Sequence, residues 1–234
     1  MTVTLFHGVV SVRQLGYYRR LRQPVGDLLA DSDPRRPVLL LQSFALDSLP
    51  LSSLEQQNSY SWLHLFGWLD QRTFEDRLTE AFADVGPVIA IGRPGEAVQP
   101  LGAAREYADE DSWRDAVLNR ARTAQLVLML VDGTPGMEWE LEHIPSVNGL
   151  RRIVLVLPPR SEVHDTRSSA WYARWEVLRG RFAFLPAVDT DVVAVLFDED
   201  GRPVVVRPLS QNLVTQLTAA REAWTPPSEA DGLS

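Results

Sequence analysis

Three glutamates, Glu138, Glu140 and Glu142, lie within five residues of one another, shortly after the apolar run AQLVLMLV. Thr134 and Pro135 predict a helix that begins here, because threonine caps helix N-termini and proline suits the first helical position. Such acids either form an exposed helix face or include a carboxylate that does chemistry. Each of the three glutamates is therefore a candidate for such chemistry.

Helical periodicity separates the three glutamates. Met137, Leu141 and Ile144 form an apolar stripe that is expected to face the core. Glu140 lies about 65° from the centre of that stripe, so its carboxylate should be partly buried and must be paired, hydrogen-bonded or functional. The other two glutamates fall on a face expected to be exposed, where the helix dipole favours acids. Glu140 is the candidate catalytic residue, and the alternative is a paired carboxylate at the edge of the core.

Four short apolar runs predict the strands that position this helix. Each run is almost continuously apolar, which is typical of parallel strands covered on both faces. Helical patterns at residues 73–86 and 111–124 lie between them, and the alternation predicts an α/β fold. We expect a flavodoxin-like, doubly wound, mostly parallel sheet with helices on both faces. The predicted strands are residues 37–44, 87–92, 124–131 and 151–158.

The remaining segments are predicted to be additions to an α/β domain at residues 37–157. Residues 1–36 form an N-terminal arm. Residues 48–71 form an insertion that carries Trp62, Phe66 and Trp68, and it is either a short helix buried on the core or a lid or assembly surface. Residues 158–224 form a C-terminal α+β extension packed on the same domain, and residues 225–234 a disordered tail.

Within the C-terminal extension, the sequence predicts a helix, a hairpin and a last helix at about residues 209–223. Asp200 and Gly201 lie between β-rich runs and predict the hairpin turn. Trp171 and Trp175 are four residues apart on the first of these helices. We expect them to pack the extension against the sheet, with an assembly surface as the alternative.

Composition restricts the class of protein. The chain has 234 residues, of which 45% are hydrophobic and 23% charged, values typical of a globular protein. Its formal net charge of −8 argues against a nucleic-acid partner. No cysteine is present and the four histidines are not at ligand spacing, so we expect no metal. No apolar run approaches the roughly 18 residues of a membrane span, so a cytoplasmic protein without a membrane partner is expected.

The carboxyl ends of the predicted strands indicate where a ligand would bind, because open parallel sheets bind ligands where the strand order switches direction. Arg93 and Gly95 belong to a glycine-containing loop that suits a phosphate group, although turn chemistry alone explains the same residues. Neither a GxGxxG nor a GxxxxGK[ST] motif is present. The other candidate residues at these strand ends are Ser43, Phe44, Asp47, Asp132 and Thr134.

Several segments of the chain resemble a Toll/interleukin receptor (TIR) domain. VLLLQSFALD resembles its first strand, RTFEDRLTEAF its first helix, and GRPGEAVQPLGAARE the loop that gates its ligand cleft. DSWRDAVLNRARTAQLVLMLVDGTPGMEWELEHI resembles the stretch that ends in the helix with the catalytic glutamate. The resemblance spans residues 37–157. Trp139-Glu140-Leu141 matches the aromatic-Glu-Leu pattern of bacterial TIR-like domains and of nucleoside deoxyribosyltransferases.

Two positions depart from the TIR pattern. The chain has His143 where eukaryotic members have the glutamate, and Ala45 where a basic residue is usual. The aromatic-Glu-Leu pattern nevertheless selects Glu140, the glutamate that helical periodicity also singles out.

The resemblance implies an NAD glycohydrolase that cleaves the nicotinamide–ribose bond, with NAD as substrate and no cofactor. Glu140 would be catalytic, Phe44 and Trp139 would stack on nicotinamide, and Arg93 would face the pyrophosphate. Ser43, Asp47 and Gly95 would contact the substrate, while Asp132 and Thr134 would orient the glutamate or the ribose. A homo-oligomer on activation and a bacterial defence or signalling role are also implied. The alternatives are a non-catalytic TIR-like interaction or nucleotide-binding module, and a nucleoside deoxyribosyltransferase-like enzyme in which Glu140 attacks the deoxyribose.

Overall fold

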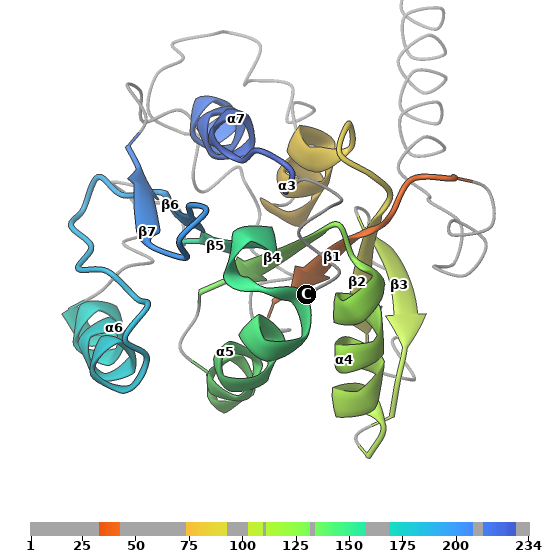
Figure 1. Ribbon diagram of the computed structural model, residues 1–234, viewed down its shortest axis with the longest axis horizontal. Helices are drawn as coiled ribbons and strands as arrows, with labels where there is room; N and C mark the ends of the chain where they lie inside the picture. Colours follow the sequence, from red (N-terminus) through yellow and green to blue (C-terminus); the bar gives the residue numbers. More distant parts are fainter. Residues whose placement is uncertain are drawn as a thin grey trace, which may run out of the picture.

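The computed structural model describes residues 33–42, 74–92, 103–109, 111–131, 134–157, 169–207 and 213–227 (Figure 1). These residues form an α/β fold with a seven-stranded sheet in the order β3-β2-β1-β4-β5-β6-β7. The strands are β1 (Val38–Leu41), β2 (Val88–Gly92), β3 (Ala104–Tyr107), β4 (Leu126–Leu130), β5 (Ile153–Val156), β6 (Ala194–Phe197) and β7 (Pro203–Val206). The helices are α3 (Phe74–Phe82), α4 (Trp113–Thr123), α5 (Pro135–Asn148), α6 (Ser169–Arg181) and α7 (Leu213–Ala223), with a 3-10 turn, η3 (Leu150–Arg152), before β5.

The sheet is mostly parallel, as the sequence predicted. Strands β1 to β5 pair in parallel, and β6 and β7 are antiparallel to their neighbours. From β1 the chain proceeds outward through β2 to β3, and then returns to place β4 on the other side of β1. The strand order therefore switches direction between β1 and β4, which is where an open α/β sheet forms its ligand crevice.

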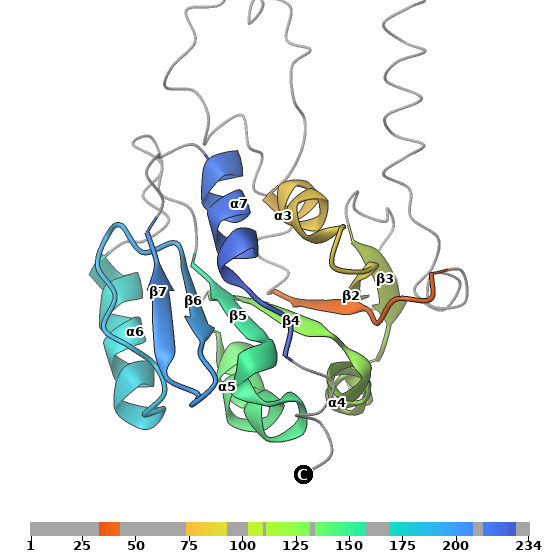
Figure 2. The ribbon, with the colours of Figure 1, turned by 45° about the horizontal axis from the view of Figure 1, so that its top comes forward.

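Helices cover both faces of the sheet (Figure 2). Helices α3 and α7 lie on one face, and α4, α5 and α6 lie on the other. Strands β1, β4 and β5 are buried at every position because alternate side chains enter one core or the other. The first core includes Leu78, Phe82 and Trp224, and the second includes Leu141, Ile144 and Trp175.

The predicted hairpin near the C-terminus is confirmed. Strands β6 and β7 pair across a turn in which Gly201 has φ +73°, a conformation that favours glycine. The Asp198 carboxylate accepts hydrogen bonds from the backbone N–H groups of Asp200 and Arg202, at 2.9 and 2.8 Å. Strand β6 pairs with β5, so the hairpin extends the same sheet rather than forming a separate one.

Trp175 also packs as the sequence predicted. It is 1% exposed in the core beneath α6, and its indole N–H donates to the carbonyl oxygen of Pro186 at 3.0 Å. Trp171 stacks on it with a centroid distance of 5.7 Å. The N-terminal arm to residue 32, the 48–71 insertion and the tail from residue 228 lie outside the described residues. No helix among the described residues is long and apolar enough to cross a membrane.

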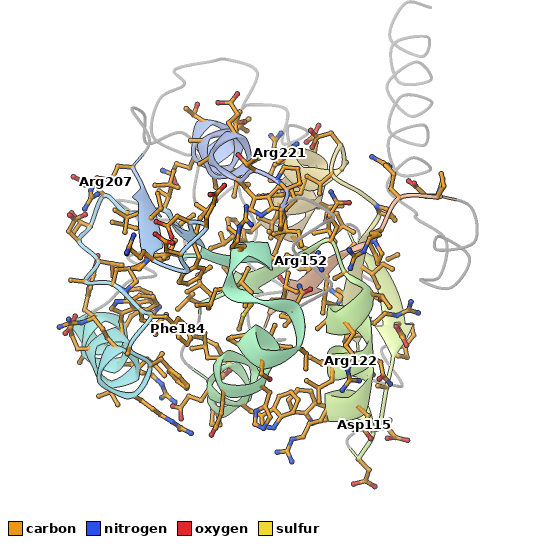
Figure 3. All side chains as sticks on the ribbon, in the orientation of Figure 1. Asp115, Arg122, Arg152, Phe184, Arg207 and Arg221 are labelled. Atoms are coloured by element: carbon orange, nitrogen blue, oxygen red, sulfur yellow. The ribbon has the colours of Figure 1, made fainter. Side chains whose placement is uncertain are left out.

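An exposed ion pair joins the two helices on the first face of the sheet. Arg221 lies where α7 meets the end of α3 (Figure 3). Its guanidinium donates to both carboxylate oxygens of Asp84, at 3.0 and 2.8 Å. This hydrogen-bonded contact holds the pKa of Asp84 below its usual value. A carboxyl group with a depressed folded-state pKa stabilises the fold above its unfolded pKa, and this contribution is lost as pH falls through the folded value.

We therefore expect Asp84→Asn to lower the free energy of unfolding near pH 7 by less than about 1 kcal/mol, since the pair is exposed and screened. The difference from wild type should shrink as the pH falls below about 4, the value of an unfolded carboxyl, and disappear once the pH is below the lowered folded-state pKa. Urea unfolding of both proteins across this pH range measures the effect. An equal difference at both ends of the range would show that the Asp84 charge does not stabilise the fold.

Candidate functional site

Helix α5 begins at the switch point of the sheet, because it follows β4 after a short connection. Thr134 caps its N-terminus in an extended conformation, and its Oγ1 accepts a hydrogen bond from the Met137 N–H at 3.4 Å. Pro135 occupies the first helical position. The predicted start of this helix is thus confirmed, and it places the first turns of α5 at the carboxyl end of β4.

Two of the three glutamates on α5 are held by arginines of α6. The Glu138 carboxylate lies 3.3 Å from Arg181 and 3.6 Å from Arg174. The Glu142 carboxylate lies 2.7 Å from Arg181. These contacts place Glu138 and Glu142 on the flank of α5 that faces α6, where they link the two helices.

The exposure of this flank differs in part from the prediction. Glu142 is exposed as expected, but the side chain of Glu138 is only 31% exposed. Glu138 is less exposed than predicted because two arginines of α6 lie against it. These arginines are distant in sequence, so the periodicity of α5 does not reveal them.

Glu140 lies on the other flank of α5. It is half-buried, as predicted from its place at the edge of the apolar stripe formed by Met137, Leu141 and Ile144. At about 100° per residue, Glu140 falls between that stripe and the flank that bears Trp139, which packs against α4. The three glutamates that are adjacent in sequence therefore have two different environments.

Trp139 packs in the interface between α4 and α5. Its ring meets Trp113 edge to face at a centroid distance of 5.0 Å and stacks on His143 at 4.5 Å. The Nδ1 of His143 donates to the Trp139 carbonyl oxygen at 2.7 Å, since a carbonyl can only accept. The guanidinium carbon of Arg114 lies 5.6 Å from each tryptophan centroid. These contacts give Trp139 a packing role, and stacking on nicotinamide stays a prediction.

A buried charged cluster lies under the first turn of α3, on the opposite face of the sheet. Glu75 and Arg105 are 2% and 1% exposed, and their charged groups are 2.7 Å apart. The same Glu75 oxygen accepts from the amide nitrogen of Gln42 at 2.6 Å, and its second oxygen accepts from the Ala103 N–H at 3.1 Å. One carboxylate thus joins the end of β1, helix α3 and the start of β3.

Neither charge of this cluster was singled out from the sequence. Glu75 has the pattern of an acid placed in a first helical turn by the helix dipole, a position that is usually exposed. Arg105 lies in β3, a strand that was not predicted because its first three residues belong to the stretch GRPGEAVQPLGAARE, which was interpreted as a loop. An arginine at a buried strand position breaks the apolar pattern, and only its distant partner explains its burial.

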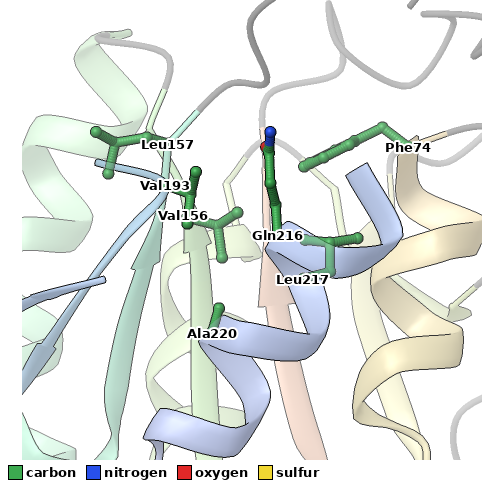
Figure 4. Close-up of a pocket in the computed structure, with 7 residues that line it drawn as sticks. All are labelled: Phe74, Val156, Leu157, Val193, Gln216, Leu217 and Ala220. Atoms are coloured by element: carbon green, nitrogen blue, oxygen red, sulfur yellow. The ribbon is translucent and has the colours of Figure 1, made fainter. Parts of the chain in front are cut away.

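A small, open pocket on the same face of the sheet is lined mainly by residues of α7 and of the region around β5 and β6, together with Phe74 of α3 (Figure 4). Gln216 extends from α7 between Phe74 and Val193, and its amide is the polar group of an otherwise apolar lining. The other lining residues are Val156, Leu157, Leu217 and Ala220.

Most of the predicted substrate-binding residues lie outside the described part of the chain: Ser43, Phe44, Asp47, Arg93, Gly95 and Asp132. The structure places Glu140, Trp139 and Thr134 together on α5 and at its cap. Among the described residues, no three acidic or histidine side chains converge as a metal-binding group.

No known protein family matches the chain, and neither curated proteins nor solved structures show a significant similarity to it.

The ion pairs of α5 with α6 allow a test of their structural role. Arg181→Gln removes the partner of Glu142 and one of the two partners of Glu138, and it should lower the free energy of unfolding by no more than about 1 kcal/mol, because Arg181 and Glu142 are exposed. The loss should shrink at high salt, which screens exposed charges. Urea unfolding at low and at high salt measures this loss of stability. A decrease of several kcal/mol in the free energy of unfolding at both salt concentrations would assign Arg181 a packing role instead.

Proposed function

We propose that this chain is a TIR-like, flavodoxin-like NAD glycohydrolase that binds NAD at the carboxyl edge of the sheet and uses Glu140 to cleave the nicotinamide–ribose bond. The main support for this proposal is that the three glutamates of α5 lie on two different flanks of the helix. Glu138 and Glu142 lie on the flank of α5 that faces α6, and Glu140 lies on the other flank, partly buried in the second turn of the helix that begins at the switch point. Open α/β sheets bind nucleotides at this place.

The chemistry needs one carboxylate. The bond between C1 of the ribose and the pyridinium nitrogen of nicotinamide breaks, and its electron pair leaves with nicotinamide, which becomes neutral. Positive charge develops on the ribose ring, and the Glu140 carboxylate stabilises that charge and holds the ribose hydroxyls. Water then adds to C1 and releases a proton, which gives ADP-ribose. NAD is the substrate, and no further cofactor enters the reaction.

The proposal includes the setting of the enzyme. We place it in the cytoplasm, where NAD is available, and in a bacterial defence or signalling role. Self-assembly would raise its activity, so the assay must include high protein concentration. Ser43, Phe44, Asp47, Arg93, Gly95 and Asp132 remain the proposed substrate contacts outside the described residues, with Thr134 and Trp139 on α5.

The test is nicotinamide release from NAD by concentrated wild-type protein, with and without a crowding agent. Exchange of the base between deoxynucleosides is measured in the same samples. Nicotinamide release without base exchange supports the glycohydrolase. Base exchange without nicotinamide release would reassign Glu140 as the nucleophile of a deoxyribosyltransferase-like enzyme. Neither activity from folded, concentrated protein would favour a non-catalytic TIR-like module.

A further inference from the structure

The Glu75–Arg105 pair is almost completely buried. Both side chains are at most 2% exposed, and removing two charges from water is costly even when they pair at 2.7 Å. Replacing such a pair by apolar residues of similar volume is often neutral or stabilising. We therefore look for the role of this buried pair in the parts of the chain that it holds in place.

The pair holds the ends of the two strands that lead into the proposed ligand residues. At the end of β1, Gln42 donates to Glu75 at 2.6 Å, and the next residue is Ser43. At the end of β2, the aliphatic stem of Arg105 packs over Gly92, where an added Cβ would lie 3.3 Å from the Arg105 Cδ. The residue after Gly92 is Arg93.

A second side chain of β3 also lies close to Gly92. The ring of Tyr107, which pairs with Gly92 across the β2–β3 ladder, would lie 3.1 Å from an added Cβ. The end of β2 is thus fixed against β3, and β3 is fixed in turn by Glu75 through Arg105 and the Ala103 N–H.

We propose that Glu75 is a positioning residue for NAD binding: through Gln42 and Arg105 it fixes the ends of β1 and β2, which the proposed ligand residues Ser43 and Arg93 follow in sequence. This inference rests on the proposed function. Glu75 touches neither the substrate nor the reacting bond in this proposal. It acts on substrate binding rather than on the chemical step, so its loss should raise KM more than it lowers kcat.

The test is the double variant Glu75→Met/Arg105→Met, which removes both charges and leaves neither one buried alone. We expect its urea midpoint to stay close to that of wild type, while KM for NAD rises about tenfold or more from the displaced strand ends. Glu80→Met is the matched control, because Glu80 is on the same helix with a side chain that is 63% exposed. A folded double variant with wild-type KM and kcat would overturn the proposal.

Gln42→Ala provides a second variant if the double variant does not fold. It deletes one tie to Glu75 and leaves the buried ion pair intact, so the protein should fold, with KM for NAD raised severalfold and kcat less affected. An unchanged KM in Gln42→Ala would overturn the proposed action through Gln42.

Hydrogen exchange separates this inference from the proposed function. If the wild type releases no nicotinamide, the proposed function fails, but the Ala103 N–H still reports on Glu75 because it donates to that carboxylate. Faster exchange at Ala103 and at the ends of β1 and β2 in the double variant, but not in Glu80→Met, would support the positioning of these strand ends by Glu75. Unchanged exchange at these amides would overturn it.

Discussion

Glu140→Gln is expected to lower kcat/KM for nicotinamide release from NAD by about 10²–10³-fold or more. Glutamine keeps the size of the side chain and removes the negative charge that would stabilise the ribose cation. The half-buried position of Glu140 strengthens the expected effect, because charges interact more strongly where water is partly excluded. The loss should appear mainly in kcat, since the interaction develops as the bond breaks.

Glu138→Gln and Glu142→Gln are the matched controls, since each makes the same chemical change on the same helix. Both side chains are engaged by Arg181, so their changes should affect stability slightly and nicotinamide release little. Circular dichroism and urea unfolding establish that all three variants are folded. Equal losses of activity in the three variants, or near wild-type release by Glu140→Gln, would remove Glu140 from its catalytic role.

The sequence predicted the elements whose signals are local. The continuous apolar runs identified β1, β2, β4 and β5, because strands buried on both faces carry few polar residues. The Thr134–Pro135 pair marked the start of α5, since capping depends only on neighbouring residues. The half-buried position of Glu140 followed from helical periodicity, which requires no knowledge of the partner helix.

The features that were missed depend on contacts between distant segments. Arg105 is buried because Glu75, thirty residues earlier in the chain, pairs with it, and no local pattern of β3 reveals that partner. Glu138 is half-buried because two arginines of α6 lie over it. The assignment of residues 158–224 as an extension of a TIR-like domain stays a prediction, and a test of the C-terminal core addresses it.

Trp175→Ala is expected to lower the free energy of unfolding by about 3–5 kcal/mol, since it deletes a large buried side chain and leaves a cavity. Trp175 is 1% exposed, stacks on Trp171 and donates to Pro186, so the lost hydrogen bond adds to the loss of packing. Val177→Ala, on the same helix at 70% exposure, should change stability by less than about 0.5 kcal/mol. Urea unfolding followed by circular dichroism measures both.

The shape of the Trp175→Ala transition tests whether the C-terminal residues fold with the rest of the sheet. Trp175 shares a core with Val127 of β4 and Leu155 of β5, and β6 pairs directly with β5. Weakening that core should therefore shift one cooperative transition to lower urea. A second, separate transition at low urea, with the remainder of the protein unchanged, would show instead that the segment carrying α6 unfolds by itself. In that case the core beneath α6 would contribute little to holding β4 and the first turns of α5 at the switch point.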